Sequence, residues 1–247
     1  MIFTIAHKEL KSMFSSPLAW VVLAFVQGVI AYVFIGSLNG FLIAQAQLAR
    51  TPNAAGLTEI AIVPMFGVGQ MLLLMSIPLL TMRLISEEKR NQTMAFLISA
   101  PISMTQIIVG KFLAMATFLF LILLLIACMA LSVTAGGTID SGLLLANLIG
   151  LFLLGISFAA IGIYISCLTT HPVVAAILSL AVFLGLWIIN LASSNPESWL
   201  NVVSLLKRFE GFMNGFVGIA DVAYFLVITG FFLVLSIRRL DSERLRA

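Results

Sequence analysis

The chain carries little charge for its length. Only 9% of its 247 residues are Asp, Glu, Lys or Arg, whereas a soluble domain has about 25% because its surface must face water. With 62% hydrophobic residues and a mean hydropathy of +1.17, most side chains need lipid as their solvent. Alternating stretches typical of barrel strands are few, so helices are the expected spanning elements.

Residues for catalysis or metal binding are scarce. Cys128 and Cys167 both lie in apolar runs, which favours buried thiols over a disulfide or a metal site. The sequence contains no HExxH, GxSxG or GxxxxGK[ST] motif, and Thr105 stands where the first glycine of the last motif would precede Gly110 and Lys111. We therefore expect no enzyme activity, cofactor or metal on this chain, so any nucleotide must be bound by a partner. No basic run predicts nucleic-acid binding.

Charges are also missing near the centres of the long apolar runs. Acidic and basic residues at that depth mark ion pumps, proton relays and ion-coupled carriers. Their absence from the sequence disfavours a carrier that works without ATP.

Six apolar runs each approach the roughly 20 helical residues that a bilayer core requires. Residues 141–196 contain no charge and would form one helix of about 84 Å, so they must fold back, most simply at Thr169, Thr170, His171 and Pro172. Residues 39–62 are mixed in polarity and are expected to form an external loop. The predicted fold is an all-α integral membrane domain over residues 1–247, with spans at 18–38, 63–82, 112–134, 143–168, 173–191 and 222–237.

The basic residues are unevenly divided between the two sides of these spans. Arg50, Lys207 and Arg208 lie on one side, and the other ten of the 13 lysines and arginines lie on the side of both termini. Because lysine and arginine accumulate in cytoplasmic loops, we expect a multi-pass protein of the bacterial cytoplasmic (inner) membrane with both termini in the cytoplasm.

Two segments on the basic side have amphipathic patterns. Residues 2–14 carry apolar side chains at helical spacing with charges between them, which predicts an interfacial helix. After the second span, the charged residues 86–93 precede apolar positions at 94, 97 and 98 and then Pro101, which predicts a short amphipathic helix that ends at the proline. This segment could be an ordinary loop that only fixes topology, or a helical docking element that receives force from a soluble partner.

The external segment before the last span is unusually apolar. Trp199, Phe209, Phe212 and Phe216 recur at helical spacing with other apolar residues, so residues 196–221 are expected to form an amphipathic or re-entrant helical pair. The pair would turn near Gly211 or at residues 214–215. A hydrophobic cap on the bundle and a gate on a substrate path are both consistent with this pattern.

Several motifs resemble the membrane subunits of type-2 ABC transporters, the ABC-2 permeases. They are Lys8-Glu9-Leu10 through Phe14-Ser15-Ser16-Pro17-Leu18, then Ser86-Glu87-Glu88-Lys89-Arg90-Asn91-Gln92-Thr93, Ala100-Pro101-Ile102-Ser103 and Gly110-Lys111-Phe112, with residues 209–215 and 221–225 near the end. The nearest branch is that of gliding-motility and nitrous-oxide-maturation permeases. The resemblance covers nearly the whole chain, and its middle motif is the most specific.

The resemblance implies an assembly and site residues. Two permease subunits, identical or paralogous, would pair and dock two ABC ATPase subunits that bind ATP and Mg²⁺. The ATPase-coupling residues would be Ser86, Glu87, Glu88, Lys89, Arg90, Gln92, Thr93, Phe96 and Pro101. A second cytoplasmic contact would be Thr169, Thr170 and His171, and the external gate would be Trp199, Phe209, Phe212 and Phe216.

The implied function is that of the membrane half of an ATP-driven exporter of an unidentified substrate. ATP binding on the partner would move the coupling segment, and the spans would rearrange between inward- and outward-facing states. The alternative is a scaffold that transports nothing and acts mechanically on a membrane-anchored accessory protein outside the cytoplasm. In either case membrane lipid surrounds the spans.

Overall fold

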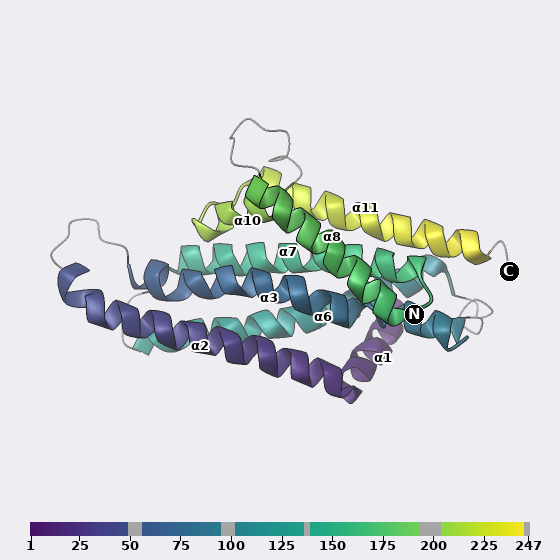
Figure 1. The fold of residues 1–247 in the computed structure, drawn as a ribbon, viewed down its shortest axis with the longest axis horizontal. Helices are drawn as coiled ribbons and strands as arrows, with labels where there is room; N and C mark the ends of the chain where they lie inside the picture. Colours follow the sequence, from purple (N-terminus) through teal and green to yellow (C-terminus); the bar gives the residue numbers. More distant parts are fainter. Residues whose placement is uncertain (49–55, 95–101, 136–138, 193–203, 245–247) are drawn as a thin grey trace.

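The computed structural model describes residues 1–48, 56–94, 102–135, 139–192 and 204–244, and no strand occurs in these ranges. Six of its helices are long and apolar enough to cross a membrane. The expected all-α integral membrane fold with six spans is therefore confirmed. Figure 1 shows the long helices gathered into an elongated bundle.

The first half of the chain supplies two spans and two shorter helices. Its elements are α1 (Ile2–Ser15), α2 (Pro17–Leu48), the π-helical turn η1 (Thr58–Ile62), α3 (Val63–Thr81) and α4 (Ser86–Arg90). The second half supplies four spans. Its elements are α6 (Met104–Leu131), the 3-10 turn η2 (Ser132–Ala135), α7 (Ser141–Leu168), α8 (Pro172–Ala192), α10 (Leu205–Met213) and α11 (Ile219–Arg244).

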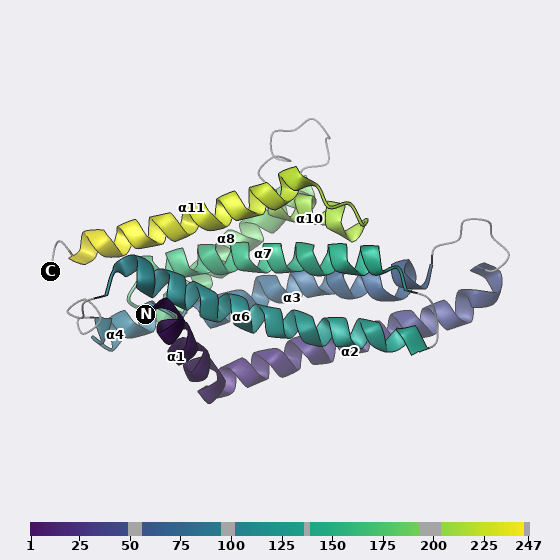
Figure 2. The same cartoon turned by 180° about the vertical axis from the view of Figure 1, so that it is seen from behind.

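Helix α7 forms the centre of the bundle, between α3 and α6 on one side and α8 and α11 on the other (Figures 1 and 2). Most residues of its span are buried, whereas only a minority of the residues in the spans of α8 and α11 are buried. Small residues let it approach its neighbours, as is common between helices in lipid. At Gly162 an added Cβ would lie 2.9 Å from Thr81 Cβ of α3.

Helix α2 is longer than the sequence predicts. It continues to Leu48, so residues 39–48 are helical, and the expected loop is wrong for this part. These residues include Asn39, Gly40 and Gln45 but no charge and no proline. Since polar uncharged residues and a single glycine lower helix propensity only modestly, they do not end a helix that has already formed.

Local capping explains where other helices begin. Ser103 and Gln106 form a reciprocal capping box, so α6 begins at Met104, well before the span predicted from residue 112. Asp140 accepts hydrogen bonds from the backbone N–H groups of Gly142 and Leu143 and caps α7. The early start of α6 places Lys111 inside a helix rather than at its edge.

Both termini lie at the same end of the bundle as α4 (Figure 2). Helix α1 crosses α6 near this end and then meets α2 at a sharp corner. At that corner Trp20 donates its indole N–H to the Phe14 carbonyl oxygen at 2.8 Å.

Candidate functional site

The charged segment after α3 forms a single helical turn rather than the predicted amphipathic helix. Helix α4 ends at Arg90, and residues 91–93 form a turn in which Gln92 has a φ of 58°. A left-handed backbone at a non-glycine residue ends a helix. The prediction of one helix continuing through residue 94 is therefore wrong, and its remainder, with Phe96 and Pro101, lies outside the described residues.

Ser166 of α7 holds the beginning of α4 in place. Its hydroxyl oxygen accepts hydrogen bonds from the backbone N–H groups of Ile85 and Ser86 at 3.3 and 3.1 Å. Both serine side chains are buried, and each hydroxyl donates to the carbonyl oxygen of Met82. These bonds satisfy backbone donors that the start of α4 leaves without partners in its own helix. The short helix is thereby fixed to the central helix of the bundle.

Lys111 is the most buried charged side chain of the described residues. Only 1% of it is exposed, and its Nζ lies 3.1 Å from Glu9 Oε1 of α1 and 2.9 Å from Glu88 Oε1 of α4. Two carboxylates therefore face one ammonium, and a buried charge of this kind is tolerated only when it is paired. The cluster joins α1, α4 and α6.

Lys89, which follows Glu88 on α4, pairs with a residue of α11 instead of α6. Its Nζ lies 2.7 Å from Glu243 Oε2 near the end of α11 and donates to the Cys167 carbonyl oxygen in the last turn of α7. A cation at a helix C-terminus is also stabilised by the helix dipole. Glu243 lies 3.3 Å from Arg239 as well. Adjacent residues of α4 thus tie it to α6, and through Lys111 to α1, and to α11, the last helix.

The crossing of α1 over α6 is unusually close. At Gly110, beside Lys111, an added Cβ would lie 2.8 Å from Ile5 Cγ2 and 3.2 Å from the Ile2 carbonyl oxygen. Only glycine lets the two helices approach to this distance. The close contact brings Glu9 within reach of Lys111.

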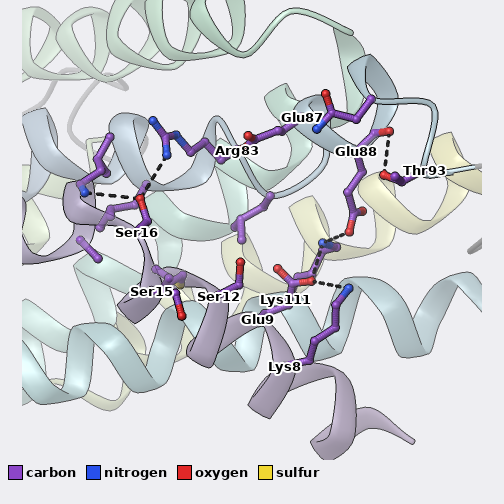
Figure 3. A pocket seen from close by; sticks show the side chains of 16 residues that line it. Lys8, Glu9, Ser12, Ser15, Ser16, Arg83, Glu87, Glu88, Thr93 and Lys111 are labelled. Carbon is purple, nitrogen blue, oxygen red and sulfur yellow. Dashed lines mark hydrogen bonds and ion pairs between the residues drawn. The ribbon is translucent and has the colours of Figure 1, made fainter.

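A cavity of about 350 Å³ lies beside this cluster, between α1, the start of α2 and the segment from α3 to α4 (Figure 3). It holds three side chains of each charge sign, and Figure 3 shows Arg83 pointing toward Ser16 and Glu88 pointing toward Lys111. Arg83 donates to Ser16 Oγ at 3.2 Å. The charged and polar residues that line the cavity are Lys8, Glu9, Ser12, Ser15, Ser16, Arg83, Glu87, Glu88, Asn91, Thr93 and Lys111.

The turn between α7 and α8 lies where the sequence predicts it. Thr169 Oγ1 accepts a hydrogen bond from the His171 backbone N–H at 3.1 Å, and Pro172 begins α8. Thr170 and His171 are exposed. These three residues make no contact with the Lys111 cluster that the structure records, so they form a separate surface.

The aromatic residues expected at the opposite end do not form one group. Phe209 and Phe212 of α10 are fully buried against α7, where a Cβ added at Gly150 would lie 2.6 Å from Phe212 Cβ. Phe216 lies beyond the turn at Gly215 and is 74% exposed. Trp199 lies outside the described residues.

The burial of Phe209 and Phe212 matches the hydrophobic cap that the sequence also allowed. An ion pair reinforces it, because Arg208 Nη1 lies 2.6 Å from Asp221 Oδ1 and the guanidinium stacks 4.4 Å from the centre of the Tyr224 ring. Helix α10 and the turn at residues 214–215 correspond to the later part of the first predicted helix and to the predicted turn, while residues 196–203 lie outside the described residues. Residues 216–218 are not helical and α11 begins at Ile219, so the prediction of a separate second helix after the turn is wrong.

Sequence reasoning missed Lys111, Glu9, Glu243 and Ser166 as site residues. Lys111 was interpreted as a charge that flanks a span, and Glu9 as part of an interfacial face. One available indication was Gly110 next to Lys111, since a small residue in a spanning helix favours a close crossing. The ion pairs of these residues join different helices. In the described ranges no group of His, Cys, Asp and Glu side chains is arranged to bind a metal.

Comparison with known proteins identifies the family of the chain. No curated protein matches the chain. A family model described as "ABC-2 family transporter protein" matches residues 3–243. A match of this extent confirms the family expected from the charged segment and its neighbours. The chain therefore belongs to the ABC-2 family of transporter proteins and is a membrane permease component.

Proposed function

We propose that this chain couples ATP hydrolysis on two partner ATPase subunits to export of a substrate, with α4 and the residues that follow it as the element that receives the force. The observation that carries the proposal is the pair of ionic links on α4, from Glu88 to Lys111 and from Lys89 to Glu243. A displacement of α4 would be transmitted to α6 and α11 directly, and to α1 through the pair of Lys111 with Glu9. The motif at residues 86–93 further favours the gliding-motility and nitrous-oxide-maturation branch.

The uneven distribution of lysine and arginine and the exposed apolar helix faces support a proposed membrane arrangement. Helix α1 lies in the inner face of the bacterial cytoplasmic membrane, and both termini and α4 face the cytoplasm. Thr169, Thr170 and His171 form a second, smaller contact with the ATPase, and two permease chains pair across exposed apolar helix faces. The cap formed by α10 would move as the outer gate, with Phe209 and Phe212 leaving their contact with Gly150.

Exposed Gln92, at the turn after α4, offers a direct test of ATPase docking. A photo-crosslinking amino acid at this position is expected to capture, in cells, a chain that contains the phosphate-binding motif GxxxxGK[ST]. The same amino acid at Ile219, which is 89% exposed at the start of α11, is the control and should not capture it. Mass spectrometry identifies the captured chain. Equal capture at both positions, or no ATPase at Gln92, would reject the docking role.

The link from Lys89 to Glu243 tests force transmission. The double variant Lys89→Met, Glu243→Gln removes both charges and leaves no buried ion without its partner. We expect ATPase docking to persist, while the equilibrium constant of the ATP-dependent conformational change falls by about fivefold or more, since coupling between sites typically amounts to 1–3 kcal/mol. Distance distributions between spin labels at Tyr32 and Val227 give the populations of the two states.

Both label positions are exposed, on α2 and α11 respectively. Arg238→Gln with Asp241→Asn is the matched control, because it removes one exposed charge of each sign from the same end of α11. A population shift in the Lys89 and Glu243 variant equal to that of the control would contradict transmission through this link.

The scaffold that drives an accessory protein remains the second candidate function. It shares the links on α4, and it differs in predicting that ATP moves the bundle without any substrate crossing the membrane.

A further inference from the structure

We propose that the cavity between α1 and α4 binds the headgroup of an aminophospholipid, with the phosphate at Arg83 and the primary ammonium at Glu87 and Glu88. The site is on the permease itself, and a lipid bound there is a resident ligand rather than the exported substrate. Only the assignment to the inner leaflet rests on the proposed function.

The charges of the cavity suit a zwitterion. Three cations and three carboxylates line it, and Lys111 already pairs with Glu9 and with one oxygen of Glu88. A purely anionic ligand would face the carboxylates and a purely cationic one would face Arg83 and Lys8. A headgroup with one charge of each sign matches both halves of the wall.

The ammonium position is defined by carboxylate oxygens that lack donors. Glu88 Oε2 is buried and has no hydrogen-bond partner in the described residues. Glu87 is half-buried, lines the same cavity and has no ion pair within the described part of the chain. Buried polar atoms of native proteins are normally satisfied, and the ammonium of a bound headgroup would supply the donor that Glu88 Oε2 lacks.

The phosphate position is defined by Arg83 and the serines near it. Arg83 is exposed, and its guanidinium points toward Ser16 at the far side of the cavity from Lys111 (Figure 3). A guanidinium presents several donors, and Ser16 occupies only one of them, so further donors remain for a phosphate oxygen. The exposed hydroxyl of Ser12 lies between the two halves of the wall.

The cavity also lies at the depth of lipid headgroups. It is bounded by Leu18 and Ala19 in the first turn of α2, next to Trp20, which is 56% exposed. Tryptophan in this position is typical of the membrane–water interface. Its volume falls within the range of about 300–1,000 Å³ common for small-molecule sites. A phospholipid can thus enter it from the adjoining leaflet.

Native mass spectrometry of the purified full chain, titrated separately with three phospholipids of identical acyl chains, tests the proposal. Phosphatidylethanolamine is expected to bind about tenfold more tightly than phosphatidylcholine, because the quaternary ammonium of phosphatidylcholine has no N–H and cannot form a charged hydrogen bond with Glu88. Phosphatidylglycerol, which lacks the cation, should bind as weakly as phosphatidylcholine. Equal binding of all three, or a preference for phosphatidylglycerol, would overturn the assignment.

Two variants locate the site. Glu87→Gln and Arg83→Gln are each expected to reduce phosphatidylethanolamine binding about tenfold, while Asp241→Asn and Arg238→Gln, exposed charges at the same end of the bundle, should leave it unchanged. Binding that survives both cavity variants would place the lipid elsewhere. Soluble phosphoethanolamine should compete poorly, and competition equal to the lipid would reject a membrane source.

The lipid experiment contains no ATPase, so it can fail while the crosslink from Gln92 succeeds. The reverse outcome is equally distinguishable, because loss of ATPase docking would leave lipid binding unaffected.

Discussion

Replacing Lys111 by methionine is expected to lower the free energy of unfolding by about 3–5 kcal/mol, because it leaves the carboxylates of Glu9 and Glu88 buried without their cation. Both carboxylates are largely buried, with side chains 12% and 15% exposed. The measurement is the unfolding midpoint and denaturant dependence in one detergent, followed by tryptophan fluorescence. The change should also free α1, since its ionic tie to α6 is lost.

Lys8→Met is the control for this substitution. Lys8 is 67% exposed and lies 3.7 Å from the same Glu9 oxygen, so its removal should cost under about 1 kcal/mol. Adding Glu9→Gln and Glu88→Gln to Lys111→Met removes the unpaired carboxylates and should recover most of the loss. If Lys111→Met were no less stable than Lys8→Met, the three-helix cluster would not hold the bundle together.

Gly162→Ala is expected to destabilise the bundle by about 1–3 kcal/mol through overpacking. The new methyl group would lie 2.9 Å from Thr81 Cβ, which is a stiff β-branched position in the adjacent helix, so α3 and α7 must separate. Because α7 is the central helix, the separation would also disturb the contact of Ser166 with α4. Thermal unfolding in the same detergent measures the loss.

Gly28→Ala supplies the matched comparison in α2. An added Cβ there meets no atom within 4 Å, and alanine in place of glycine within a helix stabilises it by roughly 0.5–1 kcal/mol. The two substitutions are chemically identical and should therefore shift the unfolding midpoint in opposite directions. Shifts of the same sign would show that close contact between α3 and α7 is not a source of stability.

The spans could be predicted from the sequence because length and lack of charge are local properties that lipid selects directly. The errors in helix bounds arise where polar or charged residues are interpreted as helix ends although the local sequence continues or begins a helix. Residues 39–48 were interpreted as a loop because polar residues interrupt the apolar run, although no residue there ends a helix. The sequence predicts the start of α6 too late, because Lys111 marks the beginning of the charge-free run, whereas the helix is capped earlier in the chain by Ser103.

The candidate site is only partly predictable for a different reason, because its residues come from distant parts of the chain. The charged motif at residues 86–93 identified the segment, but nothing in it reveals that Glu88 and Lys89 face different partners. Those partners, Lys111 and Glu243, belong to other helices and are brought near only by the folded bundle. The break at Gln92 likewise follows from backbone geometry that a polar residue type does not predict.

The ionic links that join α1 to α6 and α4 to α11 also set an order for assembly during synthesis. Glu9 is made early, yet its partner Lys111 emerges about a hundred residues later, and Lys89 must wait for Glu243 near the end of the chain. Until then Glu9 and Lys89 lack these partners from later helices, so we expect both to stay in water at the membrane surface while the first two spans insert. The nascent chain therefore holds α1 and α4 outside the lipid. We expect α1 and α4 to take their final positions only after α6 and α11, which carry the partner charges Lys111 and Glu243, have been synthesised.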